Sequence, residues 1–470
     1  MTSYSIPYNS SLAGEIRVPG DKSITHRGVL FSVLAKGDSF IRTNAIGRDN
    51  FASIRIMQQL GAEIALKLTK EMFRIAISED VINITEVSGD ECIILVSGNG
   101  IRGLRESTET LYCGNSGTTA RLLCGILSAT DFKSHLAGDE SLGGRPFDRV
   151  IEPLSKMGAA FSSNKLPFTV YGAFAKKSQG GILNGQFHLK KASAQVKSAI
   201  LLAGLFSDGE TIVTEPVMSR DHTERMLIAM NAPIHQSFEA DGRYKVLISG
   251  LSDSDLLPLD IQVPGDISAA MFFLVAGLVS NGSGLVVRGV GINPSRSACL
   301  DVLRKMNGRL EMFNDRLVGG EPVADIRVYP SKLKGVSLDG NEVARLIDEV
   351  PILSVAAAFA KGVTVFSGAE ELRVKESDRI SMTVAMLKYF GLENIEEYPD
   401  GMKIEGQSFK PTENLKSNLS EWMNSGDHRI LMSAAILEYL LSGSCTIHDY
   451  SAIETSFPGF IYGFSDHISS

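Results

Sequence analysis

Six stretches of the chain are apolar on nearly every side of a helix, and each begins with a polar turn. They are SITHRGVLFSVLAKG, GNSGTTARLLCGILSA, SAQVKSAILLAGLFSDG, GDISAAMFFLVAGLVSNG, DEVPILSVAAAFAKG and SGDHRILMSAAILEYLLSG. A helix that is apolar all round is buried between other layers of a fold. The pattern therefore predicts six core helices.

Five amphipathic stretches alternate with these core helices, and a β-rich segment follows each of them. They are FASIRIMQQLGAEI, FDRVIEPLSKMGAAF, HTERMLIAMNAPI, ACLDVLRKMNGRLEM and SMTVAMLKYFGLENI. Four are expected to end at a glycine (Gly61, Gly158, Gly308 and Gly391), whereas the third has Ala232 there. Alternating strands and helices at this period predict repeated α/β units.

The chain is also duplicated on a larger scale. VPGDKSITHRGVLFSVLAKG at 18–37 aligns without gaps with VPGDISAAMFFLVAGLVSNG at 263–282. Three units per half predict two similar domains. We expect one domain at 20–262 with repeats one to three, and another at 1–19 plus 263–470 with repeats four to six.

The composition is that of a globular protein: 470 residues, 44% hydrophobic and 21% charged. A formal net charge of -8 argues against nucleic acid or an anionic membrane as a partner. An anionic ligand would therefore need locally clustered cations. The longest apolar run, 267–279, is too short to span a bilayer, and the N-terminus lacks the features of a signal peptide.

The cysteines and glycines suggest neither a metal site nor a nucleotide cofactor. Five scattered cysteines without a C-x-x-C pair favour a reducing, cytoplasmic setting, and the histidines lack metal-ligand spacing. Gly98, Gly100 and Gly103 spell G-x-G-x-x-G, but no helical pattern opens there and no acidic residue follows about 20 residues later. We therefore expect no metal and no cofactor.

The turn VPGDKSITHR is the first candidate anion site. Asp21 or Ser23 would cap a helix running to about Ala35, and its free N–H groups would lie beside Lys22 and Arg27. Taken alone, the motif is equally compatible with a capped helix that carries two surface cations. The fourth unit has Ile267 where the first has Lys22, so its turn is expected to be structural.

Two glycine-rich motifs are further candidates. GNSGTTARLL places Asn115 and Thr118 at a helix start suited to phosphate or carboxylate, but it lacks the G-K-[ST] of a nucleotide P-loop. The segment 138–150 is expected to be a flexible loop in which Arg145 could grip such an anion through two bonds. Arg145 could equally form a salt bridge with Asp148.

Charged residues in the second half leave two interpretations open. Lys375, Glu376 and Arg379 are expected within about one helical turn, where such charges usually form a solvated face. Asp348 precedes the apolar VPILSVAAAFA and could be an ordinary helix cap or an ionised general base. If the six core helices are arranged alike, their N-termini would line one cleft for a polyanionic ligand.

Taken in order, the motifs resemble the EPSP synthase (3-phosphoshikimate 1-carboxyvinyltransferase) family of enolpyruvyl transferases. The resemblance rests on VPGDKSITHR, GNSGTTARLL, GGRPFDRV, SAQVKSAILLAG, SRDHTERM, DEVPILSVAAAFAKG, LRVKESDR, GDHR and TSFPGF. It implies an α/β fold of two inverse α/β barrel domains, built from six β-α-β-α-β-β repeats, with the active site in the interdomain cleft.

The resemblance also implies a reaction. The family transfers the enolpyruvyl group of phosphoenolpyruvate to the 5-hydroxyl of shikimate 3-phosphate in aromatic amino acid biosynthesis. Addition gives a tetrahedral intermediate, which then loses phosphate. Two phosphates and two carboxylates in one site require several fixed cations. A cytoplasmic monomer that is inhibited by glyphosate is expected.

Residue roles follow from the same resemblance. Shikimate 3-phosphate is expected to contact Lys22, Ser23, Arg27, Ser193, Ala194, Gln195, Arg220, Asp348 and Lys375. Phosphoenolpyruvate is expected to contact Lys22, Asn115, Gly117, Arg145, Gln195, Arg379 and Arg429. Asp348 would take the 5-hydroxyl proton, and Glu376 with Lys22 would handle the proton at the methylene carbon.

Two alternatives were weighed against this interpretation. The sister family, UDP-N-acetylglucosamine enolpyruvyl transferase, usually carries a cysteine acid on the loop that 138–150 matches, and no cysteine occurs there. A catalytically silent relative is disfavoured because Lys22, Arg145, Asp348, Glu376 and Arg429 are all present. One departure is Thr455, which lies where some members carry a lysine.

Overall fold

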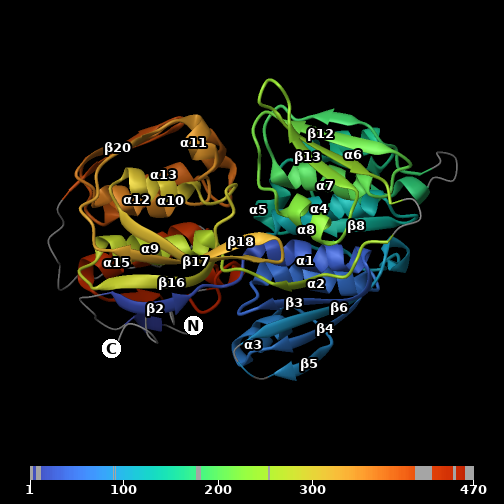
Figure 1. Cartoon of the computed structure of the whole chain (residues 1–470), viewed down its shortest axis with the longest axis horizontal. Helices are drawn as coiled ribbons and strands as arrows, with labels where there is room; N and C mark the ends of the chain where they lie inside the picture. Colours follow the sequence, from blue (N-terminus) through green and yellow to red (C-terminus); the bar gives the residue numbers. More distant parts are fainter. Residues whose placement is uncertain are drawn as a thin grey trace. The chain divides into compact units, whose positions relative to one another are not determined.

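The computed structural model describes residues 4–6, 12–87, 89, 91–175, 181–251, 255–407, 426–447 and 451–460 (Figure 1). The chain divides into two compact units. The first unit is Lys22–Val263 with Val318–Glu321, and the second is Met1–Asp21, Pro264–Leu317 and Pro322–Ser470. Each unit has its own hydrophobic core. The domain boundaries expected from the repeat stay a prediction.

The described residues of the first unit form three sheets, ordered β15-β3-β6-β4-β5, β7-β8-β10-β9 and β11-β12-β14-β13. Their strands are β3 (Lys36–Thr43), β4 (Glu63–Leu68), β5 (Ile84–Val87), β6 (Cys92–Asn99), β7 (Leu111–Tyr112), β8 (Lys133–Ala137), β9 (Ala160–Phe161), β10 (Phe168–Tyr171), β11 (Gln186–His188), β12 (Glu210–Glu215), β13 (Ile234–Phe238), β14 (Tyr244–Ser249) and β15 (Asp260–Gln262).

The second unit contains sheets ordered β17-β18-β16-β2, β19-β20-β22-β21 and β1-β23 among its described residues. Their strands are β1 (Tyr4–Ile6), β2 (Ala13–Arg17), β16 (Gly284–Gly291), β17 (Arg309–Val318), β18 (Glu321–Tyr329), β19 (Ser337–Leu338), β20 (Gly362–Phe366), β21 (Ile395–Tyr398), β22 (Gly401–Gly406) and β23 (Cys445–Ile447).

Five of the described sheets repeat one strand arrangement, which confirms the α/β repeat. A leading strand runs parallel to its neighbour in the pairs β15 with β3, β7 with β8, β11 with β12, β2 with β16, and β19 with β20. The next strand along each sheet (β6, β10, β14, β18 or β22) is antiparallel to that neighbour. Two leading strands come from distant parts of the chain: N-terminal β2 joins β16, and β15 joins β3.

All six predicted core helices are present. They are α1 (Lys22–Leu34), α4 (Gly117–Ser128) and α7 (Ala194–Gly204) in the first unit, and α9 (Ile267–Val279), α12 (Val350–Ala358) and α15 (His428–Ser442) in the second. In Figure 1, α1 covers one face of the β3-β6-β4 sheet. Gly125 allows α4 to lie directly on α7, since a Cβ there would come within 2.4 Å of the Ala199 carbonyl oxygen.

The five amphipathic helices are also present, as α2 (Arg48–Gln59), α6 (Asp148–Lys156), α8 (His222–Ala229), α10 (Ala298–Lys305) and α13 (Arg379–Tyr389). Three expected stop glycines, Gly61, Gly158 and Gly391, have positive φ. The expectation for Gly308 was wrong, because Asn307 takes the left-handed conformation at φ 66. Asn231 does the same before Ala232.

Three local predictions need correction. The pattern missed α3 (Lys70–Ser78), whose first turn is capped by the Thr69 side chain. The glycine-rich loop 138–150 contains a short helix, α5 (Glu140–Gly143), capped by Asp139. The segment around Lys375 is not α-helical: a 3-10 helix covers Glu370–Val374, and α13 begins only at Arg379.

The remaining short helices are 3-10 turns at Ile101–Gly103, Ala173–Ala175 and Ile453–Thr455, and α11 at Gly340–Ala344. No helix in the described ranges is both long and apolar enough to cross a bilayer. All five cysteines are buried and free, and burial raises the pKa of the Cys92 thiol to about 11. Such thiols are poor nucleophiles at neutral pH.

Candidate active site

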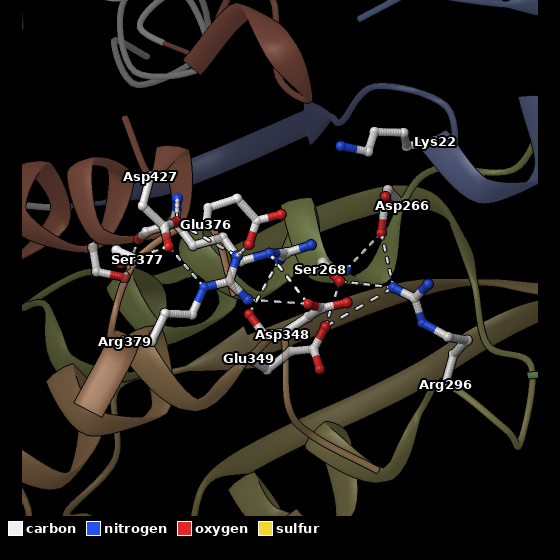
Figure 2. A network of polar contacts seen from close by, with 12 residues as sticks. Lys22, Asp266, Ser268, Arg296, Asp348, Glu349, Glu376, Ser377, Arg379 and Asp427 are labelled. Carbon is white, nitrogen blue, oxygen red and sulfur yellow. Dashed lines mark hydrogen bonds and ion pairs between the residues drawn. The ribbon is translucent and has the colours of Figure 1, made fainter. Parts of the chain in front are cut away.

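A buried arginine at the start of α13 gathers three carboxylates in the second unit (Figure 2). The Arg379 Nε donates to Asp427 Oδ2 at 2.8 Å, and its two terminal nitrogens donate to Glu376 Oε2 at 2.6 Å and Asp348 Oδ1 at 3.2 Å. Burial opposes the charge of Arg379, but these carboxylates outweigh it and raise its pKa. The planar fork of a guanidinium suits this arrangement.

Three helix N-termini supply the group. Asp348 lies two residues before α12, Arg379 begins α13, and Asp427 caps α15 by accepting from the Arg429 backbone N–H at 3.0 Å. The Arg429 side chain returns to Asp348, donating to its carbonyl oxygen at 3.1 Å and lying 3.6 Å from Oδ1. Asp348 is thus held by two arginines while its side chain stays 18% exposed.

Glu349 forms an ion pair with a different cation, Arg296. It lies 3.9 Å from Arg296, and the Ser268 hydroxyl donates to it (Figure 2). Arg296 also donates to Ser268 Oγ at 2.7 Å and to Asp266 Oδ1 at 3.2 Å. The turn before α9 was expected to be only structural, because Ile267 replaces the lysine of the first turn. It nevertheless contacts a buried cation, Arg296, which comes from another loop. Sequence reasoning missed Arg296, since the local sequence NPSRS contains no motif that indicates an ion-pairing role for this arginine.

In the first unit, α1 carries the first predicted anion turn. Lys22 is its first residue, and its Nζ donates to Asp49 Oδ2 at 2.6 Å. Arg27 is buried at 2% exposure, and its guanidinium donates to Thr223 Oγ1 at 2.7 Å and to Ser198 Oγ at 3.1 Å. Neither residue is the surface cation of the alternative interpretation.

The start of α4 brings together the glycine-rich turn and the predicted loop arginine. Arg145 donates to Asn115 Oδ1 at 2.8 Å, and Asn115 donates to Asp139 Oδ2 at 2.8 Å. A Cβ on Gly117 would lie 2.6 Å from an Arg121 terminal nitrogen and 3.4 Å from one of Arg145. Two guanidinium groups therefore flank a bare backbone position, which suits an anion.

Gln195 links this group to α7. Its amide oxygen accepts from Arg121 at 3.1 Å, and its amide nitrogen donates to Thr118 Oγ1 at 3.0 Å. Ser193 caps α7, with Oγ accepting from the Val196 N–H at 3.4 Å. Its own backbone N–H donates to Glu215.

The predicted site residues thus form two groups, each within one unit. The first unit contains Lys22, Ser23, Arg27, Asn115, Gly117, Arg145, Ser193, Ala194, Gln195 and Arg220, and the second contains Asp348, Lys375, Glu376, Arg379 and Arg429. Lys375 lies in the loop before α13 with an extended backbone. The described residues include no cluster of histidine, cysteine and carboxylate side chains able to hold a metal.

Comparison with known proteins identifies the family. The sequence model of "EPSP synthase (3-phosphoshikimate 1-carboxyvinyltransferase)" matches residues 7–87 and 81–463. The chain belongs to the EPSP synthase family. This confirms the recognised resemblance and argues against the sister family.

Curated relatives and solved structures match this chain over nearly its full length. A 3-phosphoshikimate 1-carboxyvinyltransferase of Citrifermentans bemidjiense is 43% identical over 465 residues, covering 98% of both chains. The enzyme of that name from Geobacter metallireducens is 42% identical with the same coverage. An EPSP synthase structure from Acinetobacter baumannii superposes with a TM-score of 0.77 at 36% identity, covering 99% of this chain and 98% of that one. The EPSP synthase family has the two-domain inverse α/β fold that the sequence predicted.

Proposed function

We propose that this EPSP synthase family member transfers the enolpyruvyl group of phosphoenolpyruvate to the 5-hydroxyl of shikimate 3-phosphate, releasing phosphate. One observation carries the proposal beyond family membership. Asp348 is held by Arg379 and Arg429 and yet stays partly exposed, which leaves a positioned carboxylate open to a substrate proton, as a general base requires.

The acceptor is proposed to contact the nine residues that the family resemblance assigns to it. They are Lys22, Ser23, Arg27, Ser193, Ala194, Gln195, Arg220, Asp348 and Lys375. Arg220 and Ser193 are assigned to the phosphate. In support, Ser193 lies at the N-terminus of α7, where free backbone N–H groups favour an anion.

Phosphoenolpyruvate is proposed to contact Lys22, Asn115, Gly117, Arg145, Gln195, Arg379 and Arg429. Its phosphate and carboxylate need positive partners that are already in place before the reaction. The pair of guanidiniums beside Gly117 meets this need in the first unit. Arg379 and Arg429 meet it in the second unit, since both are fixed by hydrogen bonds to carboxylate or carbonyl oxygens.

The proposed mechanism has two stages. Asp348 takes the 5-hydroxyl proton as that oxygen attacks C2 of phosphoenolpyruvate, while Glu376 with Lys22 delivers a proton to the methylene carbon C3. The product of this addition is a tetrahedral intermediate. Glu376 with Lys22 then takes a proton from the C3 methyl group as the C2–O bond to phosphate breaks, which restores the double bond and frees phosphate. Side-chain cations stabilise the charge throughout.

Phosphate release from phosphoenolpyruvate, measured with and without shikimate 3-phosphate, tests this proposal. We expect release only when shikimate 3-phosphate is present. Release that depends instead on UDP-N-acetylglucosamine would support the sister activity, and no release with either acceptor would support a silent relative.

We further propose a cytoplasmic monomer that needs no metal or cofactor and is inhibited by glyphosate. Lysine and arginine side chains supply the positive charge that a metal provides in other phosphate enzymes. Five buried, reduced cysteines fit a reducing compartment. Turnover that is unchanged by a chelator, and a mass of one chain by light scattering, would agree with this proposal.

A further inference from the structure

A lysine without any solvent exposure lies one turn beyond the start of α7. The Lys197 Nζ lies 3.0 Å from Glu215 Oε2 and 2.7 Å from Glu224 Oε1, and all three side chains are 0% exposed. The Tyr244 ring covers the ammonium at 4.8 Å. A buried charge is costly unless it is paired, so the three ionisable groups must be treated as one unit.

The two carboxylates of this cluster have different second partners. Glu215, the last residue of β12, accepts from the Ser193 N–H at 2.7 Å and from the Ser219 hydroxyl at 2.7 Å. Its Oε2 also accepts from the Ser219 N–H at 3.3 Å. Glu224, on α8, accepts only from the Tyr244 hydroxyl among the side-chain bonds described for it, at 3.4 Å.

Their surroundings raise the pKa of two members of the cluster, Glu224 and Lys197. Burial raises the pKa of Glu224 above its ordinary value, despite the neighbouring Lys197. Burial works against the charge of Lys197, but Glu224 and Glu215 outweigh it and raise the pKa of the lysine. Lys197 therefore remains a cation.

Glu215 joins the two backbone segments assigned to the phosphate of the acceptor. Ser193 begins one segment, and Ser219 directly precedes Arg220 in the other. We infer that Glu215, anchored by Lys197, is a positioning residue that fixes the Ser193 turn and the Ser219–Arg220 loop for the phosphate of shikimate 3-phosphate. This inference rests on the proposed function.

A matched pair of substitutions separates positioning from stability. Glu215→Gln and Glu224→Gln each remove one buried carboxylate from Lys197. In Glu215→Gln an oxygen at the Oε1 position still faces the Ser193 N–H and the Ser219 hydroxyl. The NH2 group at the Oε2 position, however, can neither accept from the Ser219 N–H nor pair with Lys197, so the Ser219–Arg220 loop loses its backbone bond and the anchor of the side chain is weakened. Glu224→Gln leaves both segments bonded to Glu215.

The readouts are KM for each substrate, kcat, the shikimate 3-phosphate Kd by calorimetry, and the melting temperature. For Glu215→Gln we expect KM and Kd for shikimate 3-phosphate to rise roughly tenfold or more, the scale of a lost charged hydrogen bond. KM for phosphoenolpyruvate should change less than about twofold, because Glu215 is not bonded to the residues assigned to that substrate. Glu224→Gln should lower the melting temperature with little change in either KM.

Equal rises in KM for both variants, or an unchanged KM in Glu215→Gln, would overturn the inference. Should Glu215→Gln fail to fold, Glu215→Asp is the second variant, because it keeps a negative charge beside Lys197 but shortens the side chain. It should likewise raise KM for shikimate 3-phosphate more than KM for phosphoenolpyruvate. An unchanged KM in Glu215→Asp would then overturn the inference. Wild-type phosphate release that does not depend on shikimate 3-phosphate would overturn the proposed function and this inference together.

Discussion

The Arg379 guanidinium joins two aspartates with different surroundings. Its Nε lies 2.8 Å from Oδ2 of Asp427, whose side chain is fully buried. One of its terminal nitrogens lies 3.2 Å from Oδ1 of Asp348, whose side chain is 18% exposed. Burial opposes the charge on Asp427, but Arg379 outweighs it and lowers the pKa of that carboxyl. Asp427 thus holds the arginine in place, while Asp348 stays accessible for the proton transfer that we propose. In the proposed mechanism, Arg379 therefore holds both a buried structural carboxylate and the general base.

The first prediction concerns this exposed aspartate. Asp348→Ala should lower kcat by at least ~100-fold, the scale of a lost general base, while substrate binding is largely retained. Steady-state kinetics with both substrates measures the effect. Asp301→Ala, at an exposed position on α10 of the same unit, is the control and should be near normal. Near-normal turnover in Asp348→Ala would remove Asp348 from the mechanism.

Arg27 provides the second prediction. Because the arginine is buried among hydroxyls, Arg27→Ala should weaken shikimate 3-phosphate binding by roughly 2 to 5 kcal/mol if its partner is a buried phosphate. Calorimetry with shikimate 3-phosphate gives this number, and a melting curve without ligand reports any loss of stability separately. Arg149→Ala, whose guanidinium is exposed near Lys191, is the control. Unchanged affinity in Arg27→Ala would contradict the assignment.

Most helices and strands were predictable from local pattern, whereas the roles of the site residues came from the family resemblance and stay a prediction. A polar turn followed by an all-apolar helix occupies about fifteen consecutive residues, so the local pattern alone predicts α1, α4 and α7. The positive-φ asparagines could also have been found, since Asn307 and Asn231 precede the residues that were chosen, and asparagine tolerates that conformation.

The missed features depend on contacts between distant residues. Arg296 and Glu349 lie 53 positions apart in the sequence, and Ser193 and Glu215 lie 22 apart, so neither pairing leaves a periodic signal. The error around Lys375 has a local cause. Dense charges suggested a helix, but Asp378 caps α13 by accepting from the Ser381 N–H, which delays its start until Arg379.

The third prediction follows from the space around Gly117. In Gly117→Ala the new methyl group would press on Arg121 and crowd Arg145, so both guanidiniums must move. We expect KM for phosphoenolpyruvate to rise roughly tenfold, the scale of one weakened charged bond, with a smaller change for shikimate 3-phosphate. Gly143→Ala is the matched control, because its nearest neighbour would be 3.7 Å away. Equal KM values for wild type and Gly117→Ala would argue against this site.

His26 provides a prediction about pH. Its imidazole is fully buried in α1, with Nδ1 2.8 Å from Ser53 Oγ, and burial together with Lys22 and Arg27 lowers its pKa well below 6.5. Between that lowered value and about 6.5, the unfolded chain binds a proton that the folded chain does not. The stability of the folded state should therefore decrease as the pH falls below about 6.5, by up to about 1.4 kcal/mol per pH unit.

Denaturant unfolding of the wild type and His26→Gln at several pH values between 7 and 4 measures this difference. The slope of stability against pH should be shallower in the variant, because the glutamine cannot take up the proton in the unfolded state. His135→Gln, which removes a histidine from an exposed position on β8, is the control for the substitution itself. Identical slopes for wild type and His26→Gln would show that the folded protein accommodates a charged imidazole between two cations, in conflict with the packing around α1.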